Sequence, residues 1–341
     1  MLRASAKDGL VQFLRSRTTL LTPKIQELLR AQPVGVTLGN FDGLHLGHLA
    51  LFETLERELA KRTEAPKQPL KILVTFSPHP KQVLNRITRR EAGQFPEFFK
   101  LTALRTKVEF ARKHQFSFFY NIRFSISFSM LAPDEFVRLY LVHALQAKLV
   151  VVGHDWKFGR GRSGTPEYLR ALGEKFGFQV IVVDPVKVGE LRVSSSALRE
   201  SLARGDLTEA EQMLGRPFSV IGRVIHGESR GRTLGFPTAN VHLPRQFLPK
   251  NGVYAVTAEW SGGRAKGVAN IGVRPTFGGG ARLLEVHLLD QPNLDLYGER
   301  LQVAFVSYLR EEEKFSKVED LKRAIERDIL RAREVLTEQC Q

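Results

Sequence analysis

The sequence predicts an α/β Rossmann-like domain followed by a small antiparallel β-barrel domain with a C-terminal helix. Up to about residue 212, buried-strand patterns alternate with amphipathic helical patterns, which is typical of a parallel sheet covered by helices. From residue 219 onward, short strand-like runs are separated by glycine turns, as in small barrels and sandwiches. With 341 residues the chain is long enough for two domains, which we expect at 1–212 and 213–341.

The composition is that of an ordinary globular protein that works in a reducing compartment. Cys340 is the only cysteine, which excludes an internal disulfide framework and cysteine-based zinc sites. Residues 1–30 lack the pattern of a signal peptide, and no apolar stretch is long enough to span a bilayer. We attribute the net charge of +15 to a solvated basic surface rather than to nucleic-acid binding. We therefore expect a cytoplasmic protein with neither a membrane nor a nucleic-acid partner.

The most informative stretch is the turn between a buried strand, Val34–Leu38, and the helix that follows it. His45 and His48 lie three residues apart at the start of this helix, so they share a face. The first helical turn offers unpaired N–H groups, and Gly47 allows close approach, so the turn could hold phosphates. A tight turn with two exposed histidines is the alternative, and for either histidine alone we would prefer it. The density of polar and glycine residues favours the site; these residues are Gly39, Asn40, Asp42, Gly43, His45, Gly47 and His48.

Two more strands are expected to deliver polar residues to the same edge of the sheet. The strand Leu70–Phe76 leads to His79, which lies between two prolines in a rigid loop. The strand Lys148–Val152 leads to Asp155. In open α/β sheets the carboxyl ends of the strands are where ligands bind.

Two segments of the first half have less regular patterns. We interpret residues 85–99 as an irregular basic surface loop. The alternation of Phe124, Ile126 and Phe128 suggests a strand or an edge that packs against the core.

The segment Val193–Arg199 has the pattern of a capped helix start. The hydroxyls of Ser195 and Ser196 and the adjoining N–H groups could receive phosphate oxygens, and Arg199 could supply a forked cation. A simple N-cap with a solvent-facing arginine explains the same residues equally well.

In the second half, a glycine- and arginine-rich stretch from Gly227 through Arg232 to Gly235 suits a backbone-lined phosphate loop. Thr238 and Asn240 are hard oxygen donors two residues apart, which in an extended chain face the same way, as a nucleotide-bound magnesium ion needs. Glu285 lies in the apolar strand Leu283–Leu289 and could act as a general base. Spacing alone favours the alternative that it points to solvent.

Taken together, these motifs resemble those of the bacterial bifunctional riboflavin kinase/FMN adenylyltransferases, also called FAD synthetases. The resemblance covers nearly the whole chain after about residue 33. Gly39–His48 resembles G-N-F-D-G-x-H-x-G-H, Thr75–Pro80 resembles T-F-x-P-H-P, Gly153–Gly159 resembles G-x-D-F-x-F-G, Val193–Arg199 resembles I-S-S-T-x-I-R, and Gly235–Asn240 resembles G-F-P-T-A-N.

The resemblance implies a nucleotidyltransferase domain that makes FAD from FMN and ATP, and a kinase domain that makes FMN from riboflavin and ATP with Mg²⁺. The residues that it implicates in catalysis are His45, His48, Arg199 and Glu285. Those implicated in binding ATP are Gly39, Asn40, Phe41, Gly47, Ser195, Ser196, Gly227, Arg232, Gly235 and Thr238. The flavin would meet His79, Asp155 and Arg310, and Thr238 and Asn240 would hold the metal.

Two rival interpretations remain. One is an adenylyltransferase of the same superfamily that acts on another phosphorylated acceptor, which would leave Gly235–Asn240 and Glu285 unexplained. The other is a basic RNA-binding protein without catalysis, whose RNA binding would depend strongly on salt. The expected partners are small-molecule substrates, and the sequence leaves a homo-oligomer open.

Overall fold

The computed structural model describes residues 12–16, 21–62, 68–90, 98–227, 231, 234–273, 282–291 and 294–338. The chain divides into two compact units. The first unit comprises Met1–Phe98 and Leu104–Val193, and the second comprises Phe99–Ala103 and Ser194–Gln341. The domain ranges 1–212 and 213–341 remain our proposal from the sequence.

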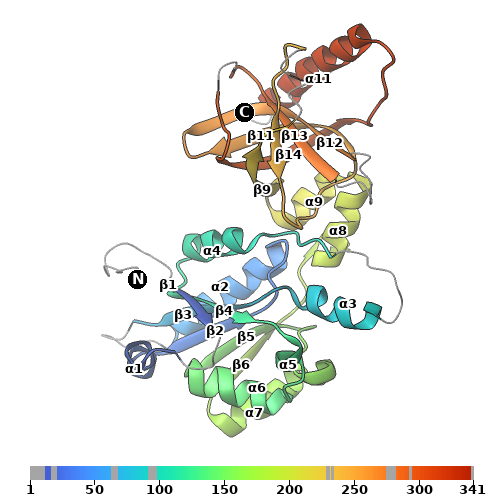
Figure 1. Ribbon diagram of the computed structural model, residues 1–341. Coiled ribbons are helices and arrows are strands. Elements are labelled where there is room, and N and C mark those ends of the chain that lie inside the picture. The colour runs from blue at the N-terminus through green and yellow to red at the C-terminus, as the bar shows by residue number, and fades with distance from the viewer. Residues whose placement is uncertain are drawn as a thin grey trace. The chain divides into compact units, whose positions relative to one another are not determined.

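The first unit is built on a parallel six-stranded sheet, as predicted (Figure 1). Its strands follow the spatial order β1-β4-β3-β2-β5-β6, and each neighbouring pair is parallel. The strands are β1 (Gln12–Ser16), β2 (Val34–Leu38), β3 (Leu70–Ser77), β4 (Phe118–Arg123), β5 (Leu149–Gly153) and β6 (Gln179–Val183). A short hairpin of β7 (Lys187–Val188) and β8 (Leu191–Arg192) follows the sheet.

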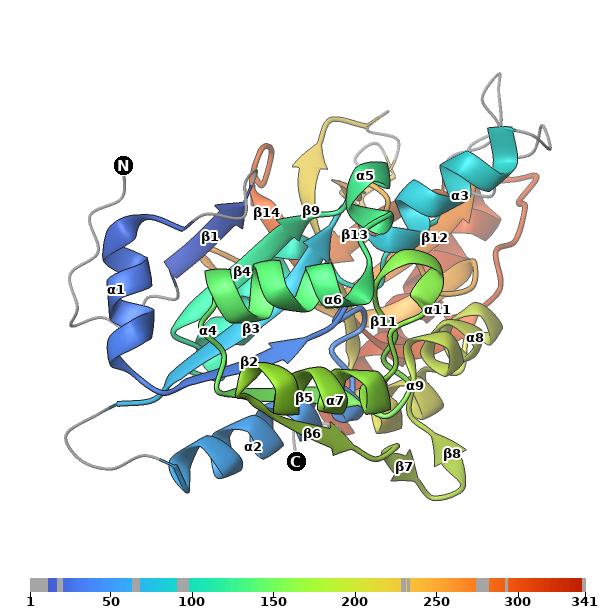
Figure 2. The same cartoon turned by 90° about the horizontal axis from the view of Figure 1, so that it is seen from below.

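Helices cover both faces of this sheet (Figure 2). On one face lie α1 (Pro23–Ala31), α6 (Pro133–Phe136) with its π-helical continuation η1 (Val137–Ala144), and α7 (Pro166–Phe176). On the other face lie α2 (Leu46–Ala60) and α4 (Leu104–Lys113). The other helical segments of this unit are α3 (Pro80–Arg90), α5 (Ile126–Ser129) and the turn η2 (Arg160–Arg162).

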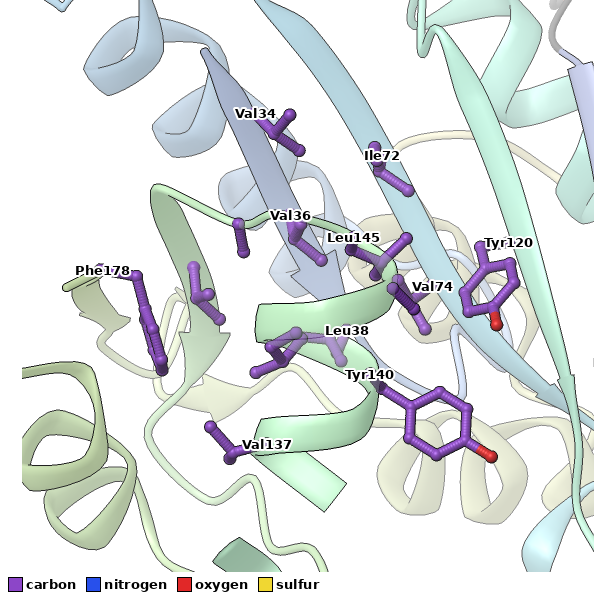
Figure 3. Packing of buried hydrophobic residues seen from close by; sticks show 14 of the residues in the cluster. Val34, Val36, Leu38, Ile72, Val74, Tyr120, Val137, Tyr140, Leu145 and Phe178 are labelled. Atoms are coloured by element: carbon purple, nitrogen blue, oxygen red, sulfur yellow. The ribbon is translucent and has the colours of Figure 1, made fainter. Parts of the chain in front are cut away.

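The two faces of the sheet pack into two separate apolar cores. On the η1 face, Val34 and Val36 of β2 and Ile72 of β3 are fully buried against the helices (Figure 3). On the α2 face, Gly35 provides the space for close packing, since a Cβ there would lie 2.8 Å from Leu55 Cδ1. Every residue of β2 is buried, as a continuous apolar run in a parallel sheet predicts.

Two local predictions in the first unit were wrong. Residues 85–90, expected to be irregular, belong to α3, while residues 91–97 lie outside the described residues. The strand expected through Phe128 ends at Arg123, because Ser125 caps α5 by accepting a hydrogen bond from Phe128 N at 3.1 Å. Phe124 and Phe128 are both half-buried, and their ring centroids lie 5.5 Å apart across the start of α5.

The second unit contains the predicted closed antiparallel barrel, with the strand order β10-β13-β12-β11-β14-β9 (Figure 1). The strands are β9 (Phe218–Ile225), β10 (Ala239–His242), β11 (Gly252–Trp260), β12 (Gly263–Val273), β13 (Arg282–Leu288) and β14 (Arg300–Arg310). Helices α8 (Ser195–Arg204) and α9 (Leu207–Leu214) precede the barrel. The C-terminal helix α11 (Val318–Glu338) packs against β11, β12 and β14. None of the described helices has the length and apolar character needed to cross a membrane.

Helix α1 offers a matched pair of leucines to test the packing of the first core. Leu29 is 1% exposed within the core, whereas its neighbour Leu28 is 41% exposed. Leu29→Ala should lower the free energy of unfolding by about 2–5 kcal/mol, because it leaves a cavity, and Leu28→Ala should change it by less than about 0.5 kcal/mol. Urea denaturation followed by circular dichroism measures both changes. Equal losses in the two variants would contradict this packing.

Candidate active sites

In the first unit, the ends of three neighbouring parallel strands bring the predicted residues to one edge of the sheet. Gly39 and Asn40 follow β2, His79 follows β3, and Asp155 follows β5. These strands are neighbours in the order β3-β2-β5. The backbone of the turn is tied to the adjacent strand, because Gly39 N donates a hydrogen bond to Val74 O at 3.1 Å. This edge is where open α/β sheets bind ligands.

The two histidines of the turn form one stacked pair. His45 is the N-cap residue of α2 and His48 lies in its first turn. Their ring centroids are 3.8 Å apart with an interplanar angle of 18°. A Cβ at Gly47 would lie 3.1 Å from His45 Nδ1, so the glycine provides the space for this stacking. The pair stands at the positive end of the helix dipole, where negative charge is stabilised.

The turn itself is held in an unusual backbone conformation by buried side chains. Phe41 and Leu44 have positive φ angles of 46° and 50°, yet both side chains are fully buried. The Phe41 ring supports His48 edge-on, with the ring centroids 5.2 Å apart. Because the Phe41 side chain belongs to the core, a nucleotide could meet only its backbone.

The two predicted flavin-binding residues of this unit each have a partner. The His79 ring stacks on Phe98 with centroids 4.4 Å apart. The carboxylate of Asp155 is 3.2 Å from Arg192 Nη2, which also lies 2.6 Å from His154 Nε2. The sequence reasoning missed Arg192, although its position three residues before Ser195 could have pointed to it.

Ser195, Ser196 and Arg199 lie at the start of α8, in the second unit. The helix is capped by the preceding Ser194, whose side chain accepts a hydrogen bond from Ala197 N at 3.1 Å. Arg199 Nη2 donates to Phe99 O at 3.0 Å. The joint action of these residues with His45 and His48 remains a prediction.

In the barrel, strand pairing places three polar residues side by side. Glu285 of β13 is directly opposite Asn240 of β10 on one side and opposite Asn270 of β12 on the other. Cross-strand neighbours point to the same face of a sheet. Leu284 and Val286 are buried in the barrel, so Glu285 projects from the opposite, outer face.

Residues of α11 line a cavity over that outer face. The alternation of apolar and polar residues in β13 could not reveal this. Glu285 lines a cavity of about 390 Å³ together with Thr238, Asn240 and Asn270. Arg310 lines the same cavity, as does Asp328 of α11. The structure thus brings Thr238, Asn240, Glu285 and Arg310, which the sequence predicted as site residues, around one space.

Asp328 is a functional candidate that the sequence reasoning missed. It is 7% exposed and accepts hydrogen bonds from Arg310 Nε at 2.9 Å and from Arg310 Nη2 at 2.8 Å. This paired geometry fixes the plane of the guanidinium. The signal in the sequence is an acidic residue on the buried stripe of α11, four residues from both Ala324 and Ala332.

A second cavity, of about 950 Å³, adjoins the first. Its lining includes Gly235, Asp290 and Tyr297. Hydrogen bonds from Arg333 lower the pKa of the Asp290 carboxyl below its ordinary value. Both cavities share part of their lining, and the shared residues are Phe236, Thr238 and His287. His287 Nδ1 lies 2.8 Å from Pro237 O, a contact that holds the segment between the cavities.

The glycine-rich loop is described only in part. A Cβ at Gly227 would collide with the carboxamide of Asn240, so this glycine makes room for a predicted metal ligand. Gly235 has a φ of 91°, which favours glycine. Arg232 lies outside the described residues.

A parallel sheet with a histidine pair at its carboxyl edge and a barrel with a carboxylate between two asparagines are suited to a transferase with two sites. The family model described as FAD synthetase matches residues 29–197, and the model described as riboflavin kinase matches residues 214–336. The chain belongs to the family of bifunctional riboflavin kinase/FMN adenylyltransferases.

Curated relatives with this name match the chain over most of their own length. The protein of Escherichia coli (strain K12) is 40% identical over 300 residues, which are 88% of this chain and 91% of the relative. The protein of Haemophilus influenzae is 38% identical over 299 residues, which are 87% of this chain and 92% of the relative.

The fold also matches a solved structure with a different name. A protein from Streptococcus pneumoniae, named as a macrolide-efflux protein, is 30% identical with a TM-score of 0.79. The match covers 94% of this chain and 98% of that protein. The likeness therefore extends over both units.

The crowding at Gly47 gives a direct test of the histidine pair. Gly47→Ala should slow the conversion of FMN to FAD severalfold, because the added methyl group pushes the His45 ring away by a few tenths of an ångström. Chromatography of FAD formed from FMN and Mg-ATP measures the rate. Conversion of riboflavin to FMN by the same preparation is the internal control and should be unchanged. A wild-type rate of FAD formation would contradict the role of the stacked pair.

Proposed function

We propose that the second unit phosphorylates riboflavin to FMN and that the first unit transfers AMP from a second ATP to FMN, giving FAD and pyrophosphate. The observation that best supports this division is the pair of adjoining cavities in the second unit. A kinase must hold a nucleotide and an acceptor so that their reacting groups meet. Thr238 lines both cavities, at the point where the phosphoryl group would pass.

In the kinase site, we assign the larger cavity to ATP and the smaller one to riboflavin. Gly235 lines the larger cavity, as expected of a backbone-lined phosphate loop. Glu285 and Arg310 line the smaller one, where Glu285 would accept the proton of the ribityl hydroxyl as its oxygen attacks the γ-phosphorus. The bond from the γ-phosphorus to the bridging oxygen would break, and ADP would leave. Arg310, fixed by Asp328, would contact the flavin.

The kinase site also suits a magnesium ion. The described residues hold no group of three or more acidic, histidine or cysteine side chains that could bind a metal by themselves. The Thr238 hydroxyl and the Asn240 carboxamide nevertheless offer hard oxygen atoms, and nucleotide phosphates supply the remaining ligands in such sites. Mg²⁺ would neutralise charge on the phosphates. The position of Asn240 opposite Glu285 on the paired strands supports this role.

In the adenylyltransferase site, no protein nucleophile is needed. The phosphate oxygen of FMN would attack the α-phosphorus of ATP, and the bond to the pyrophosphate oxygen would break. His45 and His48, stacked at the start of α2, would stabilise the negative charge on the triphosphate. Ser195, Ser196 and Arg199 would bind the same phosphates.

The remaining residues at this edge would bind the two substrates. The stacked rings of His79 and Phe98 offer a flat surface suited to the flavin ring. Asp155 would help to bind FMN after leaving Arg192, since its side chain is 69% exposed and the pair is accessible. We further propose that the enzyme works in the cytoplasm with small molecules as its substrates.

The wild-type chain supplies the first test. Given riboflavin and Mg-ATP, it should form FMN and then FAD, which chromatography resolves over time, and chelation of Mg²⁺ should stop the first step. An RNA-binding protein without catalysis would make neither product. An adenylyltransferase for another acceptor would make neither product from riboflavin and would form no FAD when FMN is supplied.

Two variants should separate the activities. His48→Ala should slow FMN to FAD roughly ten- to hundredfold and leave riboflavin to FMN unchanged, because one charge-assisted contact is lost. Glu285→Ala should slow riboflavin to FMN and spare FMN to FAD. Equal loss of both activities in either variant would contradict two independent sites.

A further inference from the structure

The first unit contains a buried lysine that the reactions above do not use. Lys107 of α4 is only 5% exposed, whereas Lys113 at the end of the same helix is exposed. A lysine is rarely buried unless its ammonium group is paired or hydrogen-bonded. The contacts of Lys107 therefore indicate what it stabilises.

The Lys107 ammonium group donates a hydrogen bond to the backbone carbonyl of Asn40, with an Nζ–O distance of 2.5 Å. The Thr75 hydroxyl donates to the same oxygen at 3.3 Å. A carbonyl oxygen has two lone pairs, so these two donors satisfy it from two elements, α4 and β3. The charged donor makes the stronger of the two bonds.

This carbonyl stands at the beginning of the strained turn. Phe41, Gly43 and Leu44 all have positive φ angles, of 46°, 99° and 50°. Non-glycine residues keep such angles only when the surrounding structure holds them. The turn ends at His45, whose ring stacks on His48. The Asn40 peptide therefore lies at the start of the segment that leads to the histidine pair.

We propose that Lys107 is a positioning residue for AMP transfer, which acts on His45 and His48 through the carbonyl of Asn40. This inference rests on the proposed role of the first unit. Lys107 works together with Thr75 on one acceptor atom, so the effects of removing the two donors should be coupled.

The test uses the full-length chain with FMN and Mg-ATP. Lys107→Met removes the donor but keeps an unbranched apolar stem, and it should lower kcat for FAD formation at least tenfold. The Michaelis constant for ATP should rise less than kcat falls, because misplaced histidines stabilise the transition state less. Riboflavin phosphorylation in the same preparation should be unchanged.

The matched control is Lys113→Met, which changes an exposed lysine of the same helix and should leave both activities at the wild-type level. Thr75→Val provides a second variant in case Lys107→Met does not fold, and it should cause a smaller fall in kcat of the same kind. In the double variant, kcat for FAD formation should fall by less than the product of the two single fold-reductions.

A wild-type rate of FAD formation by folded Lys107→Met would overturn the inference. It would also be overturned if Lys107→Met and Thr75→Val lost FAD formation and riboflavin phosphorylation to the same extent. Multiplicative effects in the double variant would also overturn it. Failure of the wild-type chain to make FAD would instead refute the proposed function, so the two failures are distinguishable.

Discussion

The antiparallel pairing on both sides of β13 holds Glu285 opposite Asn240 and opposite Asn270 at the same time. A shift of one residue in this register would turn the carboxylate into the barrel core, because successive side chains of a strand face opposite sides. Parallel register has the same importance in the first unit, where it brings the ends of β2, β3 and β5 to one edge. The backbone pairing of the strands therefore determines which side chains meet in each site.

The two units stabilise their sites by different means. In the first unit, a turn with three positive φ angles is held by burying Phe41 and Leu44 and by hydrogen bonds to the Asn40 carbonyl. The apolar core stabilises a backbone that the local sequence alone would not adopt. In the second unit, regular strands carry Asn240 and Glu285, and α11 supplies Asp328 to fix Arg310.

The sequence predicted the fold class, because almost every long helix and strand of both units shows the apolar periodicity of its type. It treated Thr238 and Asn240 as extended chain but did not identify β10 as a barrel strand, because its four residues are too few to show a periodicity. Alternation was right that Glu285 faces away from the barrel core, but it could not show that α11 lines a cavity there. Lys107 and its acceptor Asn40 are 67 residues apart, so only the folded chain reveals why a lysine is buried.

The central claim is that two separate sites on one chain act in sequence through FMN. The most direct test mixes purified His48→Ala with purified Glu285→Ala in the presence of riboflavin and Mg-ATP. The account predicts that neither variant alone forms FAD at the wild-type rate and that the mixture does so after a lag, as FMN passes from one variant to the other. A mixture that forms no more FAD than the separate variants, although each retains one activity, would contradict it.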